Sequence, residues 1–73
     1  MKILDLRNIP CPQNSSKALI FLATVDIGQH IELHIDDGEP IENVPPSLEI
    51  EGHKVIKKVQ TPELYWVLTV IAA

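Results

Sequence analysis

Residues 29–36, QHIELHID, alternate polar and apolar side chains. Since successive side chains of a β-strand point to opposite faces, Ile31, Leu33 and Ile35 share one face while the polar residues share the other. The stretch therefore predicts a strand that is buried on one face only. Neighbouring elements must cover that face.

A short strand and a helix are predicted before this stretch. Residues 3–6 have the apolar character of a strand, and a helix is predicted from Pro12, because proline fits the first turn of a helix. The apolar residues that follow recur at helical spacing: Ala18, Leu19, Leu22 and Ala23. We expect Gly28 to close this helix in the left-handed conformation that glycine adopts readily.

A turn at residues 37–38 and a second helix that opens at Pro40 are predicted after the strand. The apolar residues of this helix are Ile41, Val44, Leu48 and Ile50. A proline inside a helix removes a backbone hydrogen bond and clashes with the preceding turn. We therefore expect Pro45-Pro46 to break the helix into two short pieces that end before Gly52.

Two further strands are predicted at residues 53–60 and 64–71, with a short turn between them. Strands joined in this way form an antiparallel hairpin. The order βαβαββ predicts an α+β fold, a two-layer open-faced sandwich in which two helices cover one face of a four-stranded mixed sheet. We expect residues 1–73 to form a single domain.

The composition excludes several classes of protein. Ten acidic and six basic residues give a formal net charge of −4, which argues against binding to nucleic-acid phosphates. No apolar run approaches the roughly 20 residues of a membrane span. The single cysteine excludes an internal disulfide, and Asp5 and Arg7 interrupt the apolar residues that a signal peptide would need. We expect a cytoplasmic protein that binds neither membranes nor nucleic acids.

Cys11 is the residue whose position most suggests chemistry. It directly precedes Pro12 and is therefore predicted at or just before the start of a helix. The positive end of the helix dipole favours a thiolate there, and the thiolate is the nucleophilic form of cysteine. The alternative is a small buried hydrophobe, which is how free cysteines usually serve.

The run LDLRNIPCP at residues 4–12 resembles the signature of the TusA-like (SirA-like) sulfur-carrier family. Further landmarks of that family follow in order: Gly28 before a strand, Asp36-Asp37, Pro40-Ile41, residues 52–55 and a closing hairpin. The resemblance covers nearly the whole chain. It implies a βαβαββ two-layer sandwich, in agreement with the periodicity.

The resemblance also implies a chemical role. In this family the cysteine of a Cys-Pro-x-Pro motif receives a sulfane sulfur from a donor enzyme and passes it on as a persulfide, and by position that cysteine is Cys11. Pro12 would set the angle at which the chain leaves Cys11, and the following N–H groups would bind the anionic sulfur.

Two residues depart from the family pattern. Asn14 stands where the second motif proline is expected, and Asn8 stands where a glycine usually follows the arginine. Asparagine caps helices well, so the helix starts either at Pro12 or later, with Asn14 or Ser15 as its N-cap. Asn8 suits a position of positive φ better than most residues other than glycine.

Several other side chains are candidates for a site. Arg7 either helps to hold the thiolate or a partner's acidic surface, or is a solvated cation at the end of the first strand. Tyr65 and Trp66 are predicted on opposite faces of the last strand.

Metal binding and a histidine base have weak support. His30 and His34 would lie about 13 Å apart along a strand, too far for one metal ion. Nothing in the sequence brings His53 to Cys11, and the acidic residues 36–39 lack the spacing of a calcium loop. We expect neither a metal nor an organic cofactor.

The leading hypothesis is a sulfurtransferase-type persulfide carrier with Cys11 as its reactive residue and Pro12, Arg7 and Asn14 in support. Its partners would be a sulfur-donor protein such as a cysteine desulfurase and a protein sulfur acceptor. The alternative is a non-catalytic interaction or regulatory module that has the same fold and has lost sulfur transfer.

Overall fold

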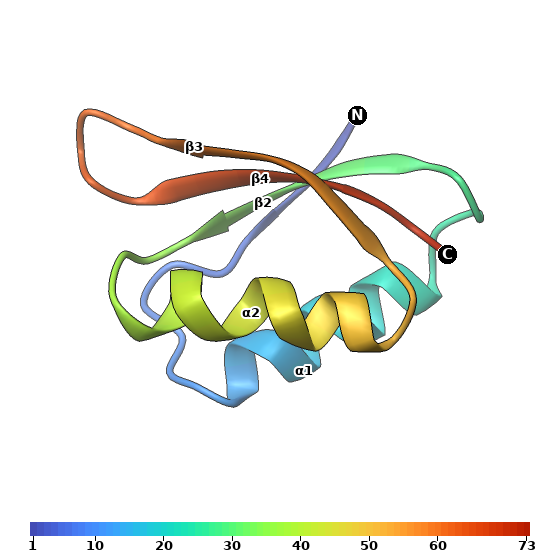
Figure 1. Cartoon of the computed structure of the whole chain (residues 1–73), viewed down its shortest axis with the longest axis horizontal. Coiled ribbons are helices and arrows are strands. Elements are labelled where there is room, and N and C mark those ends of the chain that lie inside the picture. Colours follow the sequence, from blue (N-terminus) through green and yellow to red (C-terminus); the bar gives the residue numbers. More distant parts are fainter.

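The computed structural model describes residues 1–73 and contains six elements of regular structure (Figure 1). In chain order these are β1 (Lys2–Asp5), α1 (Gln13–Ala23), β2 (His30–Ile35), α2 (Glu39–Ile50), β3 (Lys54–Gln60) and β4 (Trp66–Ile71). The predicted order βαβαββ is confirmed. Neither helix is long and apolar enough to cross a membrane.

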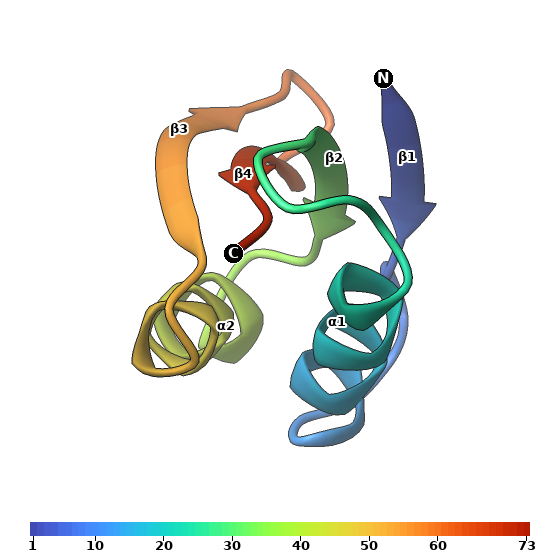
Figure 2. The same cartoon turned by 90° about the vertical axis from the view of Figure 1, so that its right-hand side faces the viewer.

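The four strands form one mixed sheet in the order β1-β2-β4-β3. β1 and β2 are parallel, whereas β4 is antiparallel to both β2 and β3. Figure 2 shows α1 and α2 side by side beneath one face of the sheet, with the other face uncovered. The predicted open-faced sandwich is therefore confirmed, and its core can only lie between the helices and the covered face.

The core is a cluster of eleven buried side chains between the two layers. Ile31, Leu33 and Ile35 of β2 are completely buried in it, and His30 on the other face of the strand is exposed. The alternation of residues 29–36 thus predicted the buried face of β2 correctly. Leu22 from α1 and Leu48 from α2 are also buried, which fastens both helices to the sheet.

Four of the six elements are somewhat shorter than predicted, and α1 differs most. The helix ends at Ala23, with Thr24 as its C-cap, so Gly28 does not close it. Gly28 has φ +87° and lies in the turn that leads into β2, where the N–H of Gln29 donates to the carbonyl of Asp26. Glycine is needed there for the turn rather than for the helix cap.

The prediction that Pro45-Pro46 breaks the second helix is wrong. α2 continues through both prolines as one helix of twelve residues. Val44 and Leu48 lie one turn apart and are completely buried, so their packing favours a continuous helix over two separate pieces. The two prolines leave the carbonyls of Ile41 and Glu42 without their usual helical partners, and these two residues are partly exposed and exposed, so water can reach this turn of the helix.

The topology places the starts of both helices at one edge of the sheet. Because β1 and β2 are parallel, the chain leaves both strands at the same edge, and α1 and α2 both begin there. Residues 6–12 and residues 36–40 therefore approach each other although about 28 positions separate them in sequence. Cys11 lies in the first of these segments.

Candidate functional site

Two hydrogen bonds, both donated by backbone N–H groups, hold the loop between β1 and α1 to the rest of the fold. The N–H of Leu6 donates to the carbonyl of His34 at 2.8 Å, and the N–H of Asn8 donates to Oδ2 of Asp36 at 2.7 Å. Asn8 has φ +68°, which confirms that this position needs a residue tolerant of positive φ. The loop that carries Cys11 is thereby tied to the loop between β2 and α2.

Pro12 is the N-cap residue of α1, and the helix begins at Gln13. Cys11 thus lies immediately before the helix, as predicted, whereas Asn14 is the second helical residue and not the cap. The N–H of Asn14 donates to the carbonyl of Pro10 at 3.1 Å, and the N–H of Ser15 donates to Oδ1 of Asn14 at 2.7 Å. These two N–H groups of the first turn are therefore already occupied.

The thiol of Cys11 has one side-chain partner. Nδ2 of Asn14 donates a hydrogen bond to Sγ of Cys11 at 3.3 Å. Asn14 is completely buried, while Cys11 is half-buried and reaches the surface. The residue that replaces the expected proline is therefore the one that touches the sulfur, a contact that the sequence did not predict.

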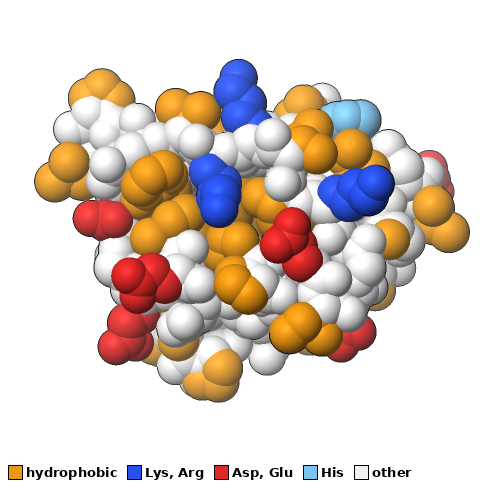
Figure 3. Space-filling view, viewed as in Figure 1, with side chains coloured by type: hydrophobic (Ala, Val, Ile, Leu, Met, Phe, Trp, Pro, Cys, Tyr) orange, Lys and Arg blue, Asp and Glu red, His pale blue; other side chains and the backbone are white.

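Cys11 lines a shallow hollow of about 420 Å³ that the β2–α2 loop completes from the other side. The carboxylates of Asp36, Asp37 and Glu39 belong to this lining. Figure 3 shows acidic side chains gathered at the left end of the molecule, where this loop lies, and lysines over β3. The surroundings of the thiol are therefore acidic.

The sequence contained a signal for this acidic lining. Asp36 and Asp37 follow a strand that is parallel to β1, and the loops that leave parallel neighbouring strands at one edge of a sheet lie close together. Taken by themselves, residues 36–39 predict only a turn and the start of a helix. The pairing of β1 with β2 was needed to place them next to Cys11.

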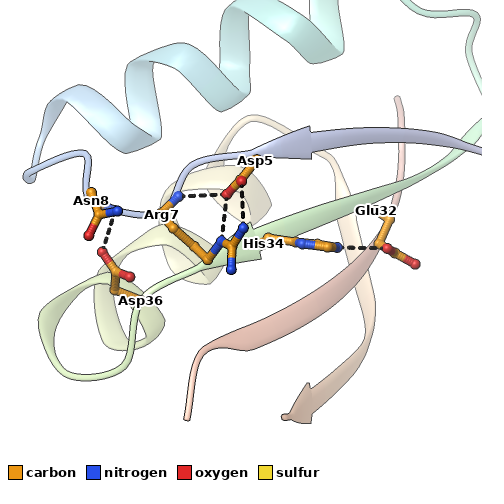
Figure 4. A network of polar contacts seen from close by, with 6 residues as sticks. All are labelled: Asp5, Arg7, Asn8, Glu32, His34 and Asp36. Atoms are coloured by element: carbon orange, nitrogen blue, oxygen red, sulfur yellow. Dashed lines mark hydrogen bonds and ion pairs between the residues drawn. The ribbon is translucent and has the colours of Figure 1, made fainter. Parts of the chain in front are cut away.

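Arg7 lies in a polar network on the uncovered face of the sheet (Figure 4). Its Nε and Nη2 donate to the carboxylate of Asp5 at 3.0 and 2.9 Å, and its guanidinium lies 4.4 Å from the centre of the Tyr65 ring. The hydrogen bonds from Arg7 lower the pKa of Asp5 to about 2, and the same pair raises the pKa of Arg7. The guanidinium contacts Asp5 and Tyr65 rather than the sulfur.

The Arg7–Asp5 pair gives a testable dependence on pH. A depressed carboxyl pKa stabilises the fold above the unfolded value of 3.8, and this stabilisation is lost as the pH falls towards about 2. Since Asp5 is half exposed, we expect less than about 1 kcal/mol. Asp5→Asn should therefore lower the free energy of unfolding slightly at pH about 6, and the difference should vanish near pH 2.

Denaturant unfolding of both proteins across this pH range measures the difference. A gap between wild type and Asp5→Asn that stays constant down to pH about 2 would contradict the assignment. Lys2→Gln changes a charge on the same strand and serves as the control, because Lys2 takes part in no ion pair.

Tyr65 and Trp66 lie on opposite sides of the sheet, as predicted. Tyr65 contacts Arg7 and stacks obliquely on His34, with ring centres 5.5 Å apart, on the uncovered face. Trp66 packs against the core, and its Nε1 donates to Oδ1 of Asp37 at 2.9 Å. That bond fixes the β2–α2 loop beside Cys11, and sequence alone did not reveal it.

The histidines have structural partners away from the thiol. Nε2 of His34 lies 2.7 Å from Oε2 of Glu32 on the uncovered face. His53 follows the C-terminus of α2, about 18 Å along that helix from its start, and its Nδ1 accepts the N–H of Ala73 at 3.0 Å. His53 and Cys11 therefore lie at opposite ends of the molecule. No group of three or more His, Cys, Asp or Glu side chains is arranged to hold a metal.

Comparisons with known proteins point to one family. The family model described as Sulfurtransferase TusA matches residues 2–71. A protein of Archaeoglobus fulgidus named "Putative sulfur carrier protein" is 29% identical over 65 residues, which make up 89% of this chain and 74% of that protein.

Two solved structures share the fold. The crystal structure of a SirA-like protein from Desulfitobacterium hafniense has a TM-score of 0.83 at 19% identity and covers 100% of this chain and 99% of its own. The solution structure of a Helicobacter pylori protein has a TM-score of 0.78 at 18% identity, and the match covers 97% of this chain and 96% of that protein. At these identities the two structures support the fold alone.

Proposed function

The chain belongs to the TusA sulfurtransferase family of sulfur carriers, and we propose that it accepts a persulfide sulfur on Cys11 and relays it to an acceptor protein. The observation that carries this proposal is the position of Cys11. Cys11 is partly exposed just before α1 and lines a shallow hollow that is open to a second protein. An accessible thiol is what transfer between two proteins requires.

The proposed reaction consists of two exchanges at sulfur. In loading, the Cys11 thiolate attacks the outer sulfur of a donor persulfide, a bond forms between Sγ and that sulfur, and the donor leaves as a thiolate. In delivery, an acceptor thiolate attacks the outer sulfur, and Cys11 leaves as a thiolate. The proton on the outer sulfur stays with it in both steps. Neither step needs an outside oxidant or reductant.

The supporting residues have different proposed roles. Pro12 ends the loop and caps α1, so it determines where Sγ lies relative to the helix. Asn14 donates to Sγ. Arg7 has its charge balanced by Asp5, so we propose that it shapes the adjoining surface for a partner rather than holding the thiolate.

The partners follow from the chemistry. The donor is a protein that carries a persulfide, such as a cysteine desulfurase, and the acceptor is a protein with a reactive thiol. The acidic lining of the hollow favours basic surfaces on both. We place the protein in the reducing cytoplasm, where an exposed cysteine remains a free thiol.

Intact-mass spectrometry tests the proposal. After incubation with a cysteine desulfurase and cysteine, the full-length protein should become one sulfur atom heavier, and dithiothreitol should reverse the change. Cys11→Ser should gain no sulfur. If the wild type gains none, or if Cys11→Ser gains it equally, the carrier role is wrong and the fold serves as a non-catalytic interaction module.

A further inference from the structure

Asn14 is the one buried polar side chain that contacts the proposed reacting atom. It is completely buried, and its amide lies between two partners, the backbone N–H of Ser15 and the sulfur of Cys11. No other side chain donates a hydrogen bond to this sulfur. The family motif has proline at this position, and proline has no group that could make either contact.

The orientation of the Asn14 amide follows from its surroundings. The N–H of Ser15 needs an acceptor and lies 2.7 Å from Oδ1. If the amide were turned over, its NH₂ group would face that N–H, and two donors would oppose each other. The NH₂ group must therefore point at Sγ, which makes Asn14 a hydrogen-bond donor to the sulfur.

We propose that Asn14 is a catalytic residue of the delivery step, in which it stabilises the negative charge that returns to Sγ of Cys11. This inference rests on the proposed function for its biological meaning. When the acceptor thiolate takes the outer sulfur, the bond between the two sulfurs breaks and its electron pair stays on Sγ. A hydrogen bond to a charged group is stronger than one to a neutral group, so the bond from Nδ2 strengthens as the charge appears.

The same bond has the opposite consequence in loading. There Sγ begins as a thiolate and loses its charge as it attacks, so a donor that stabilises the thiolate also makes it less nucleophilic. Asn14 therefore favours release of sulfur over its capture. A carrier with this residue passes sulfur on more readily than one with proline at the same position.

The size of the effect of removing the Asn14 donor can be estimated for exchange between Cys11 and a small-molecule thiol. A hydrogen bond to a charged group changes an equilibrium constant by about tenfold. About half of the charge has developed in the transition state of thiol exchange, so the rate at which Cys11 leaves should change by about threefold. These two values are the expected effects of removing the donor.

The first experiment measures the equilibrium of full-length protein with oxidised and reduced glutathione, at pH about 9.5 so that thiols are ionised. Asn14→Ala and Asn14→Pro both lack the donor. Proline is tolerated in the first turn of a helix, although it also removes the bond from the backbone N–H of residue 14 to the carbonyl of Pro10. Both should form the Cys11–glutathione mixed disulfide with an equilibrium constant about tenfold higher than the wild type. Gln13→Ala, an exposed change in the same turn, should leave it unchanged.

Circular dichroism shows whether each variant is folded. If Asn14→Ala does not fold, the measurement on Asn14→Pro tests the inference. Equilibrium constants within about twofold of the wild type would overturn the inference. So would a shift seen in only one folded variant, because both lack the same donor. The glutathione measurement needs no sulfur donor, so its outcome is independent of whether the protein carries sulfur.

A second experiment applies the inference to the persulfide. With Cys11 loaded, transfer of the outer sulfur to dithiothreitol should be about threefold slower in both variants than in wild type and Gln13→Ala. If glutathione exchange shifts as expected but no persulfide forms, Asn14 stabilises the Cys11 thiolate, but the carrier function fails and with it the role of Asn14 in delivery. If persulfide forms and neither measurement shifts, the carrier function stands and the role of Asn14 fails.

Discussion

Replacing Leu33 with alanine is expected to lower the free energy of unfolding by about 3 kcal/mol. Leu33 is completely buried at the centre of β2, with β1 on one side and β4 on the other. Its truncation removes apolar contacts in the core and leaves a cavity between the sheet and the helices. A chain of 73 residues typically has a stability of about 4 to 11 kcal/mol, so this loss is a large share of the total.

Urea unfolding monitored by circular dichroism measures the change in stability. His30→Ala is the matched control, because His30 lies on the same strand and is exposed on the opposite face. It should change the stability by less than about 0.5 kcal/mol. Equal losses for both variants would show that β2 does not bury one face only, and the assigned fold would be wrong.

Replacing Gly38 with alanine is expected to cost about 2 kcal/mol. Gly38 is the N-cap residue of α2 and has φ +88° and ψ −131°, a combination that residues with a side chain rarely adopt. A Cβ at this position would meet no atom within 4 Å, so the cost comes from backbone conformation and not from a clash. The strain would fall on the loop that carries Asp36 and Asp37.

Gly38→Asn sharpens this test. Asparagine tolerates the left-handed helical region, where ψ is positive, but Gly38 lies outside that region. Asparagine should therefore destabilise the protein about as much as alanine does. If asparagine restored most of the stability in thermal or urea unfolding, the loop conformation described for Gly38 would be incorrect.

The sequence predicted the elements of the fold well because their signals are local. The alternation in residues 29–36 and the spacing of Ala18, Leu19 and Leu22 depend only on the period of a strand or a helix. The prediction that Pro45-Pro46 breaks the helix is wrong because it considers local sequence alone. Proline disfavours the interior of a helix, but burial of Val44 and Leu48 in the core favours continuation of this one.

What the sequence alone determined is the βαβαββ order, the buried face of β2 and the family motif that makes Cys11 the candidate reactive residue. Only the tertiary structure decided what surrounds that thiol. The parallel pairing of β1 with β2 brings Asp36 and Asp37 to it, and the first turn of α1 aims the amide of Asn14 at its sulfur. Contacts across some 28 residues depend on how the strands are ordered, and a periodic pattern within one element carries no information about that order.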